Sequence, residues 1–548
     1  MKKKSVILCA VIALLLAFAV VTTVLLNFYK VTIDKFFLGQ GADFSKYDDT
    51  AARVTCENIE REAVVLLKNE NALLPLKTSA NDKKKIVLLG MGAYDMRFAG
   101  AGSGGGNAEG ADSFYDALEG KNISLCPEVK EFYGKFKKND SSTGGFDDVG
   151  KEIGSPEIAF KNFTNKTKEA AKNYSDTAVY IITRVGGEGS TLTDLLLSLT
   201  KNEEETLDFI TASFDKVLVV LNTSNPLELG FLDGKGTSRN TDENYSKYVG
   251  KIDGALWIGL PGYTGANAVA EIITGVSPSG RLADTYAYDV NSAPSASSVA
   301  NAENIYAGYR WYETAAFEGA IDYGEYERTS EKAYATKKIA SGVQFPFGYG
   351  LSYTSFKKEV VLSESQVLDT ISDKEKNAEI KIAVKVTNTG ETEGKEVVEL
   401  YYTAPYISGG IEKSYVCLAD FAKTKSLKPG ESETKTLSIK VSDMKSFDYN
   451  DKNGNGFCGY ELEKGTYLLR VLDNAHGWTT VGEDSALTVK AEVTENIKYI
   501  TDEATTESVE ARFSSYADKR EYLSRANGFE NLSANVKSGE DVDRKSVV

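Results

Sequence analysis

The sequence predicts an α/β protein in which a mostly parallel sheet, layered between helices, is followed by an antiparallel β-sandwich and preceded by a transmembrane helix. Three observations lead to this prediction. An uncharged apolar run occupies residues 6–26, short apolar runs alternate with helical patterns over residues 50–356, and a period-two apolar pattern begins near residue 378. With 548 residues, the chain is long enough for two or three domains.

The N-terminal run has the length of a membrane-spanning helix. Its 21 residues follow Lys2, Lys3 and Lys4, and as a helix they would extend about 31 Å. The run is longer than the core of a secretory signal, so we expect an uncleaved signal anchor at residues 1–28 and a spacer at 29–49. The lysines place the N-terminus in the cytoplasm, which predicts a single-pass cell-membrane protein whose bulk is extracellular. A cleaved signal peptide is the main alternative.

The region 50–356 alternates between strand-like and helix-like segments. A stripe formed by Ile59, Ala63, Leu66 and Leu67 predicts an amphipathic helix that ends near Asn69. Short apolar runs closed by Gly, Asn or Pro predict strands that are buried on both faces. These runs are residues 85–89, 178–182, 216–221 and 255–258.

A clear helix start separates two of these strands. Thr200 and Glu203 have the spacing of a capping box and predict a helix over residues 200–213. Repeated alternation of strand and helix implies right-handed crossovers and helices on both faces of the sheet.

In the region 357–490, the apolar period changes to two. Ile380, Ile382, Val384 and Val386 alternate with more polar residues, and residues 437–441 and 467–471 look similarly strand-like. Turn sequences at residues 388–390 and 428–430 join such strands, so the region predicts an antiparallel β-sandwich. Residues 491–548 are charged and weakly periodic, which predicts a linker or the start of another domain.

Composition excludes several kinds of chemistry. The net charge of −16 and the absence of a Lys/Arg cluster outside the termini argue against nucleic acid as a partner. Five cysteines without Cys-x-x-Cys spacing argue against a disulfide framework or zinc site. His476 is the only histidine, so a Ser-His-Asp triad would have to use it. Hydrolytic chemistry in this chain would therefore run on carboxylates.

One carboxylate has the right setting for this chemistry. Residues 183–189 (Thr-Arg-Val-Gly-Gly-Glu-Gly) follow a predicted buried strand and place Glu188 among three glycines. In an open parallel sheet, ligands bind at the carboxyl ends of the strands, where such a carboxylate can act as a general acid or base. The alternative is a solvated acidic turn.

A glycine-rich loop follows the first predicted parallel strand. Residues 100–105 match Gly-x-Gly-x-x-Gly, but they begin about ten residues after the strand, whereas a dinucleotide fingerprint begins at the strand end. A substrate-facing loop fits better, with Arg97 beside it to donate hydrogen bonds and Ser103 within it. The alternative for Arg97 is a surface cation.

Two further motifs are ambiguous. Residues 451–456 (Asp-Lys-Asn-Gly-Asn-Gly) imitate a calcium loop, but position twelve is Leu462 instead of Glu, so a tight hairpin is expected. Residues 306–312 are aromatic enough to stack on a sugar, although aromatic residues also cover core edges. No metal and no organic cofactor is predicted.

Four segments together resemble glycoside hydrolase family 3, the β-glucosidase and β-xylosidase family. They are residues 62–76, 260–265, 277–282 and 345–353, the last reading Phe-Pro-Phe-Gly-Tyr-Gly-Leu-Ser-Tyr. The resemblance implies an α/β sandwich domain followed by a fibronectin type III-like domain. It also implies that Glu188 is the acid/base and that Arg97 and Ser103 line the leaving-group side of the substrate. Residues 190–192 (Ser-Thr-Leu) depart from the acidic-basic pair common in the family, which leaves the preferred sugar open.

In this family the nucleophilic aspartate comes from a separate (β/α)8 barrel, and the region before Glu57 is too short to contain one. A subgroup carries the barrel last, and residues 522–526 resemble its lead-in. We therefore expect a membrane-anchored retaining β-glycosidase that acts on oligosaccharides, and a reading frame truncated before its barrel. The rival hypotheses are a non-catalytic carbohydrate-binding surface protein and a nucleotide-binding enzyme. The oligomeric state stays open.

Overall fold

The structure is a computed structural model that divides into two compact units, Met1–Thr55 and Cys56–Val548. It describes residues 14–16, 18–19, 21–23, 49–79, 82–100, 104–106, 110–136, 157–186, 197–237, 240, 242–294, 303–323, 342–502, 504–509 and 522–530. The described residues between 14 and 23 are helical. Across the described ranges, no helix is both long and apolar enough to cross a membrane. Most of the transmembrane helix predicted at residues 1–28 falls outside these ranges.

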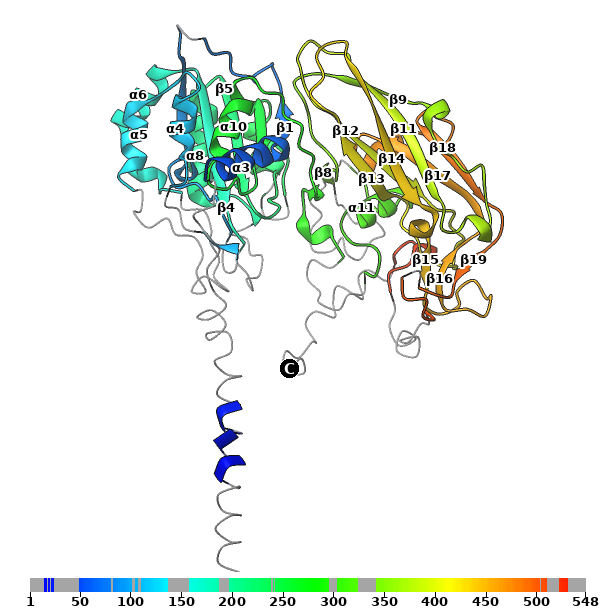
Figure 1. Ribbon diagram of the computed structural model, residues 1–548. Helices are drawn as coiled ribbons and strands as arrows, with labels where there is room; N and C mark the ends of the chain where they lie inside the picture. Colours follow the sequence, from blue (N-terminus) through cyan, green and yellow to red (C-terminus); the bar gives the residue numbers. More distant parts are fainter. Residues whose placement is uncertain are drawn as a thin grey trace, which may run out of the picture. The chain divides into compact units, whose positions relative to one another are not determined.

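A six-stranded sheet forms the centre of the first domain, with the strand order β1-β6-β5-β4-β2-β3 (Figure 1). All neighbouring strands are parallel except β1, which pairs antiparallel with β6. The mostly parallel α/β sheet predicted from the sequence is therefore confirmed. The strands are β1 (Val65–Asn69), β2 (Lys84–Leu89), β3 (Ile123–Leu125), β4 (Thr177–Arg184), β5 (Lys216–Thr223) and β6 (Gly254–Trp257).

Helices cover the two faces of this sheet. They are α3 (Asp49–Ala63), α4 (Phe114–Glu119), α5 (Pro127–Gly134), α6 (Asn165–Tyr174), α8 (Lys201–Ser213), α9 (Asp242–Tyr245) and α10 (Gly265–Thr274). Helix α4 packs against α10, whereas α5 packs against α6. Helix α8 begins with the predicted capping box, in which the Thr200 and Glu203 side chains each bond to the other residue's backbone amide.

The strand order reverses direction between β2 and β4. From β2 the chain moves outward to β3, and it then returns past β2 to β4, β5 and β6. Since crossovers between parallel strands are right-handed, the helices that follow β2 and β4 lie on opposite faces of the sheet. The topological switch point therefore lies at the carboxyl ends of β2 and β4, which is where open α/β sheets bind ligands.

The predicted helix through Asn69 is wrong in its second half. Helix α3 ends at Ala63, and the chain continues as strand β1. Ile59, which the helical stripe would bury, is 65% exposed, whereas Leu66 and Leu67 are at most 1% exposed. A continuous apolar run that pairs with β6 is buried on both faces, and this tertiary burial favours a strand over the helical stripe.

The second domain is the predicted antiparallel β-sandwich. One sheet has the order β10-β18-β17-β12-β13 and the other has the order β14-β11-β9 (Figure 1). Ile380, Ile382, Val384 and Val386 are all 0% exposed on β11, which confirms the predicted alternation. Only the short β10–β18 pair is parallel among the described strands of this sandwich. The strands are β9 (Phe356–Val360), β10 (Thr370–Ile371), β11 (Glu379–Asn388), β12 (Val397–Thr403), β13 (Cys417–Lys423), β14 (Ser432–Lys440), β17 (Gly465–Leu472) and β18 (Thr488–Val493).

Smaller elements complete the described fold. A three-stranded sheet contains β15 (Ser446–Asp448), β16 (Gly459–Leu462) and β19 (Ile497–Tyr499), and β7 (Tyr286–Ala287) pairs with β8 (Val343–Phe345). Helix α11 spans Tyr309–Phe317. Strands β18 and β19 extend the second domain across and beyond residue 490, where the sequence predicts its end, because buried residues keep alternating with Lys490 and Glu492.

Short 3-10 helices lie in the connections between these elements. They are η2 (Met91–Ala93), η5 (Phe160–Asn162), η6 (Gly230–Leu232), η7 (Ser246–Tyr248), η8 (Val290–Ser292), η10 (Leu362–Glu364), η11 (Asp373–Glu375), η12 (Val441–Met444), η13 (Ala475–Thr479) and η14 (Arg525–Asn527).

Candidate active site

The candidate site begins where β2 ends beside β4. Gly90 follows β2 with a φ of 95°, and a Cβ there would lie 2.4 Å from the main-chain oxygen of Ile181 on β4. Only glycine allows this turn and this close approach. The chain therefore leaves β2 directly against β4 and enters the loop that contains Arg97.

Arg184 fixes the loop that follows β4. Its guanidinium is fully buried and donates two hydrogen bonds to the Glu203 carboxylate, at 2.7 Å from Nη1 and 2.5 Å from Nη2. Nη2 also donates to the main-chain oxygen of Ser198 at 2.8 Å. Arg184 precedes residues 187–196, whereas Ser198 and Glu203 follow them, so one buried fork joins the described residues on the two sides of this segment. Glu188, the predicted acid/base, lies in this segment and outside the described residues.

Asn222 links three segments at the same edge of the sheet. This buried residue near the end of β5 accepts a hydrogen bond from the Arg97 main-chain nitrogen at 2.8 Å and donates to the Arg97 main-chain oxygen at 2.8 Å. Its amide also donates to the main-chain oxygen of Gly259, beyond β6, at 2.7 Å. Sequence reasoning missed Asn222, although a single amide that interrupts a buried apolar strand was a usable signal.

The side chain of Arg97 is 15% exposed, so it is not the exposed surface cation of the alternative interpretation. Its Nη2 lies 3.4 Å from Oδ2 of Asp95. Among the described residues, Arg97 Nε and Asp95 Oδ1 are buried without a hydrogen-bond partner. One donor and one acceptor are thus left beside the glycine-rich loop, and a hydroxyl group can satisfy both. Ser103, the other predicted binding residue, lies outside the described residues.

Glu157 supports the loop after β2 by a buried hydrogen bond to its main chain. Its carboxyl group is 8% exposed and accepts hydrogen bonds from the Met91 main-chain nitrogen at 3.0 Å and the Tyr133 hydroxyl at 3.2 Å. Burial raises the pKa of Glu157 to about 8, so the group is mostly protonated at neutral pH. It braces 3-10 helix η2, and no sequence motif marks it.

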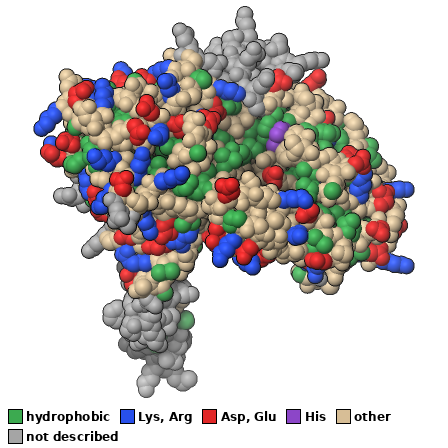
Figure 2. Space-filling model, turned by 90° about the horizontal axis from the view of Figure 1, so that it is seen from above, with side chains coloured by type: hydrophobic (Ala, Val, Ile, Leu, Met, Phe, Trp, Pro, Cys, Tyr) green, Lys and Arg blue, Asp and Glu red, His purple; other side chains and the backbone are tan. Residues whose placement is uncertain are grey.

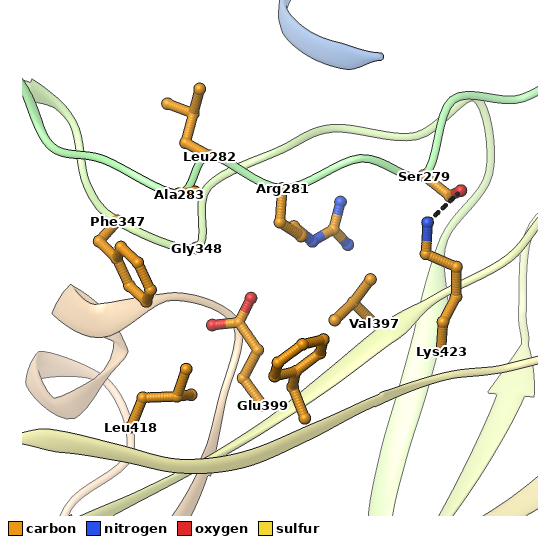
Figure 3. Close-up of a pocket in the computed structure, with 11 residues that line it drawn as sticks. Ser279, Arg281, Leu282, Ala283, Phe347, Gly348, Val397, Glu399, Leu418 and Lys423 are labelled. Carbon is orange, nitrogen blue, oxygen red and sulfur yellow. Dashed lines mark hydrogen bonds between the residues drawn. The ribbon is translucent and has the colours of Figure 1, made fainter. Parts of the chain in front are cut away.

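A separate pocket of about 250 Å³ lies between the two domains (Figure 3). Segments 279–283 and 347–348 line it from one side, and β12 and β13 line it from the other. The Glu399 carboxyl and the Arg281 guanidinium point into it, and Lys423 donates to Ser279 Oγ at 3.1 Å on its edge. Burial raises the pKa of Glu399 to about 8, and the Tyr401 hydroxyl donates to it at 2.6 Å. Arg97, which the sequence predicts as a binding residue and the structure describes, does not line this pocket.

His476 pairs with a buried carboxylate. Its Nδ1 lies 2.8 Å from Oε2 of Glu313, and its ring stacks on Tyr323 with centroids 3.5 Å apart. The aromatic stretch at residues 306–312 is core, because Tyr306 and Trp311 are both 0% exposed.

On the face seen in Figure 2, Lys and Arg side chains are interspersed with Asp and Glu. Within the ranges that the structure describes, no group of three or more His, Cys, Asp or Glu side chains is placed to hold a metal ion.

An open, mostly parallel sheet with loops gathered at its switch point, joined to an antiparallel sandwich, defines a two-domain α/β protein of the ligand-binding type. The model of the glycosyl hydrolase family 3 C-terminal domain matches residues 64–353, just over half of the chain. The model of a fibronectin type III-like domain matches residues 396–475. The chain therefore belongs to glycosyl hydrolase family 3.

Individual relatives agree with this assignment. The chain is 29% identical over 469 residues to β-glucosidase A of Butyrivibrio fibrisolvens, covering 78% of this chain and 50% of the relative. It is 31% identical over 444 residues to a β-glucosidase of Ruminococcus albus, covering 78% and 39%. The chain thus spans half or less of the length of these relatives.

Solved structures show the same fold. A β-glucosidase from Paenibacillus barengoltzii superposes with a TM-score of 0.65 at 29% identity, covering 82% of this chain and 44% of that one. β-Glucosidase 3B from Thermotoga neapolitana, in complex with α-D-glucose, superposes with a TM-score of 0.61 at 25% identity, covering 82% and 55%.

Proposed function

We propose that this chain carries the acid/base half of the active site of an exported, membrane-anchored retaining β-glycosidase of the β-glucosidase type. The observation that carries the proposal is the buried Arg184–Glu203 fork, which joins the described residues on the two sides of the segment containing Glu188. Arg97 comes to the same edge of the sheet through Asn222. The relatives named β-glucosidases and the glucose complex support β-glucosides as the substrate class.

In this proposal Glu188 protonates the leaving oxygen while an aspartate attacks the anomeric carbon. Glu188 then removes a proton from the water that cleaves the glycosyl-enzyme. The two carboxyl groups of a retaining pair lie about 5–5.5 Å apart. The described sheets include no (β/α)8 barrel, and the proposal assigns the aspartate to such a barrel, as the family resemblance implies. Arg97 and Ser103 would hold hydroxyl groups on the leaving-group side.

The test uses the protein extended through its native downstream sequence. Glu188→Gln should lower kcat for 4-nitrophenyl β-glucoside by about 10²–10⁴-fold, because the leaving oxygen loses its proton donor. The rate of the glycosylation step, measured as kcat/KM, should fall less for a dinitrophenyl glucoside, because its leaving group needs less protonation. The membrane anchor is tested in the same preparation: activity should sediment with membranes and become soluble when residues 1–28 are deleted.

Glu205→Gln is the matched control, because Glu205 is a carboxylate on nearby α8 whose side chain is 41% exposed, and its loss should leave kcat unchanged. An equal loss of kcat/KM, which reports the glycosylation step, with both leaving groups would remove the acid/base role from Glu188. Glucoside binding without any hydrolysis by the extended wild-type protein would favour the non-catalytic carbohydrate-binding alternative instead.

A further inference from the structure

The hairpin loop between β15 and β16 carries three side chains whose oxygen atoms accept hydrogen bonds from the loop's own main chain. Both carboxylate oxygens of Asp451 accept from the Gly456 main-chain nitrogen, at 3.0 and 3.1 Å. Asn453 Oδ1 accepts from the Asn455 main-chain nitrogen at 3.2 Å, and Asn455 Oδ1 accepts from the Phe457 main-chain nitrogen at 3.0 Å. The side chains at positions 1, 3 and 5 of the loop are therefore each fixed against its main chain, in the order that a calcium loop uses.

Glu461, on strand β16, contacts the same loop. The residue is 0% exposed, and its Oε2 accepts from the side-chain amides of Asn453 at 3.1 Å and Asn455 at 2.6 Å. Its Oε1 is buried and has no hydrogen-bond partner among the residues that the structure describes. A buried carboxylate oxygen without a partner is costly, and a bound cation is the direct way to satisfy it.

The sequence rule looks for the closing carboxylate at position twelve, which is Leu462. On a strand, however, successive side chains point to opposite faces. Leu462 packs into the sandwich core, and Glu461 one residue earlier faces the loop. The closing carboxylate is therefore present at position eleven, where the loop geometry of an EF-hand would not place it.

We propose that this loop and β16 form a Ca²⁺ site, with carboxylate oxygens from Asp451 and Glu461 and neutral oxygens from Asn453, Asn455 and the Phe457 carbonyl. Carboxylate, amide and main-chain oxygens in a flexible loop suit Ca²⁺ better than Mg²⁺, which demands a small octahedron. The amide oxygens of Asn453 and Asn455 each accept one main-chain hydrogen bond, and the second lone pair of each oxygen is left for the cation.

Neighbouring charges set the expected affinity. The Lys498 ammonium donates to the main-chain oxygen of Asn455 at 3.2 Å, so one positive charge already lies beside the site. The Asp448 carboxylate accepts hydrogen bonds from the main-chain nitrogens of Asn450, Lys452 and Asn453. It therefore stabilises the loop instead of binding the cation. With two carboxylates and an adjacent ammonium, we expect the weak affinity of extracellular calcium modules, with a Kd of about 10⁻⁴–10⁻³ M.

The experiment titrates the full chain, purified in detergent and stripped with EDTA, with CaCl2 in a calorimeter. We expect one Ca²⁺ per chain and a rise in Tm of about 2–5 °C at about 5 mM CaCl2, with a smaller effect of MgCl2. Asp451→Asn and Glu461→Gln should each abolish the calorimetric site. In EDTA, Glu461→Gln should not lower Tm, because glutamine keeps an acceptor for both asparagines and removes a buried charge.

Asp443→Asn is the matched control, because Asp443 is an exposed carboxylate on the preceding 3-10 helix η12 and should leave Ca²⁺ binding intact. The proposal is overturned if the wild-type chain shows no saturable Ca²⁺ binding up to about 5 mM. It is equally overturned if Glu461→Gln binds Ca²⁺ as the wild type does, or if that variant loses Tm in EDTA as a purely structural residue would.

Discussion

At the residue scale, buried glutamates distinguish this chain from a protein whose acids all face solvent. Burial raises the pKa values of Glu60, Glu157 and Glu399 to about 8 in each case. Each carboxyl group lies on or beside a different structural element, so the effect is spread over both domains. In all three, desolvation is the largest cause, because the charged form loses its water without gaining an adequate partner.

Glu399 makes the consequence measurable. Its pKa is raised from 4.5 to about 8, so the folded state keeps a proton that the unfolded state releases above pH 4.5. Its contribution to stability is complete below about pH 4.5 and is lost as the pH rises through about 8. Glu399→Gln is neutral at every pH and still accepts from Tyr401. We expect the fall in unfolding free energy between pH 5 and pH 8.5 to shrink by on the order of a few kcal/mol.

Denaturant unfolding at the two pH values measures this difference. Glu364→Gln, at an exposed glutamate of 3-10 helix η10, should leave the pH dependence of the wild type unchanged. A Glu399→Gln variant with the full wild-type pH dependence would show that Glu399 is ionised in the folded protein.

At the element scale, α8 connects helix capping to the candidate site. Glu203 bonds back to the Thr200 main-chain nitrogen at 2.7 Å and also receives the buried guanidinium of Arg184. One carboxylate thus starts the helix and joins it to Arg184, on the other side of the segment that contains Glu188. The Arg184–Glu203 pair is fully buried, and removal of either partner would leave an unpaired charge.

The cap can be weakened without breaking that ion pair. Thr200→Ala removes the hydroxyl that accepts from the Glu203 main-chain nitrogen at 3.4 Å and donates to its carboxylate at 2.9 Å. We expect a loss of about 1 kcal/mol in unfolding free energy by urea titration, and Thr200→Ser should recover most of it. Equal losses in both variants would assign the effect to the threonine methyl group instead of the cap.

At the scale of the whole molecule, a buried ion network joins the two domains. Glu396, just before β12, is 6% exposed. Its Oε2 lies 2.8 Å from Nη2 of Arg281, in the first domain, and its Oε1 lies 2.7 Å from Nζ of Lys358, on β9. Lys423 of the second domain bonds to Glu62 and Ser279 of the first. Ser279, Arg281 and Lys423 of this network line the pocket of Figure 3. The contacts between the domains predict that the domains unfold together.

Removal of Glu396 should uncouple them. Glu396→Gln leaves Arg281 without its ion-pair partner and Lys358 with Asp473 alone, and a broken buried pair costs about 3–5 kcal/mol. We expect one calorimetric unfolding transition in the wild type, and a lower or split transition in Glu396→Gln. Glu391→Gln, at an exposed carboxylate just before β12, should unfold like the wild type. Two separate transitions already present in the wild type would contradict the coupling.

The sequence predicted much of the fold because its patterns are local. The alternation from Ile380 to Val386 predicts β11, and the spacing of Thr200 and Glu203 predicts the start of α8. It predicted the parallel sheet and placed Arg97 next to a loop after β2, but it assigned Leu66 and Leu67 to a helix. The role of Glu188 stays a prediction, because residues 187–196 are not among the residues that the structure describes.

The sequence by itself determined which residue types stand where strands end: a glutamate among glycines after β4, an arginine after β2 and an oxygen-rich turn before β16. Only the tertiary structure decided what these side chains meet. It brought Asn222 to the backbone of Arg97, Glu203 to Arg184, and Glu461 to Asn453 and Asn455. The physical reason is that periodicity reports which face of an element is buried, whereas partners distant in sequence come together only when the sheets pack.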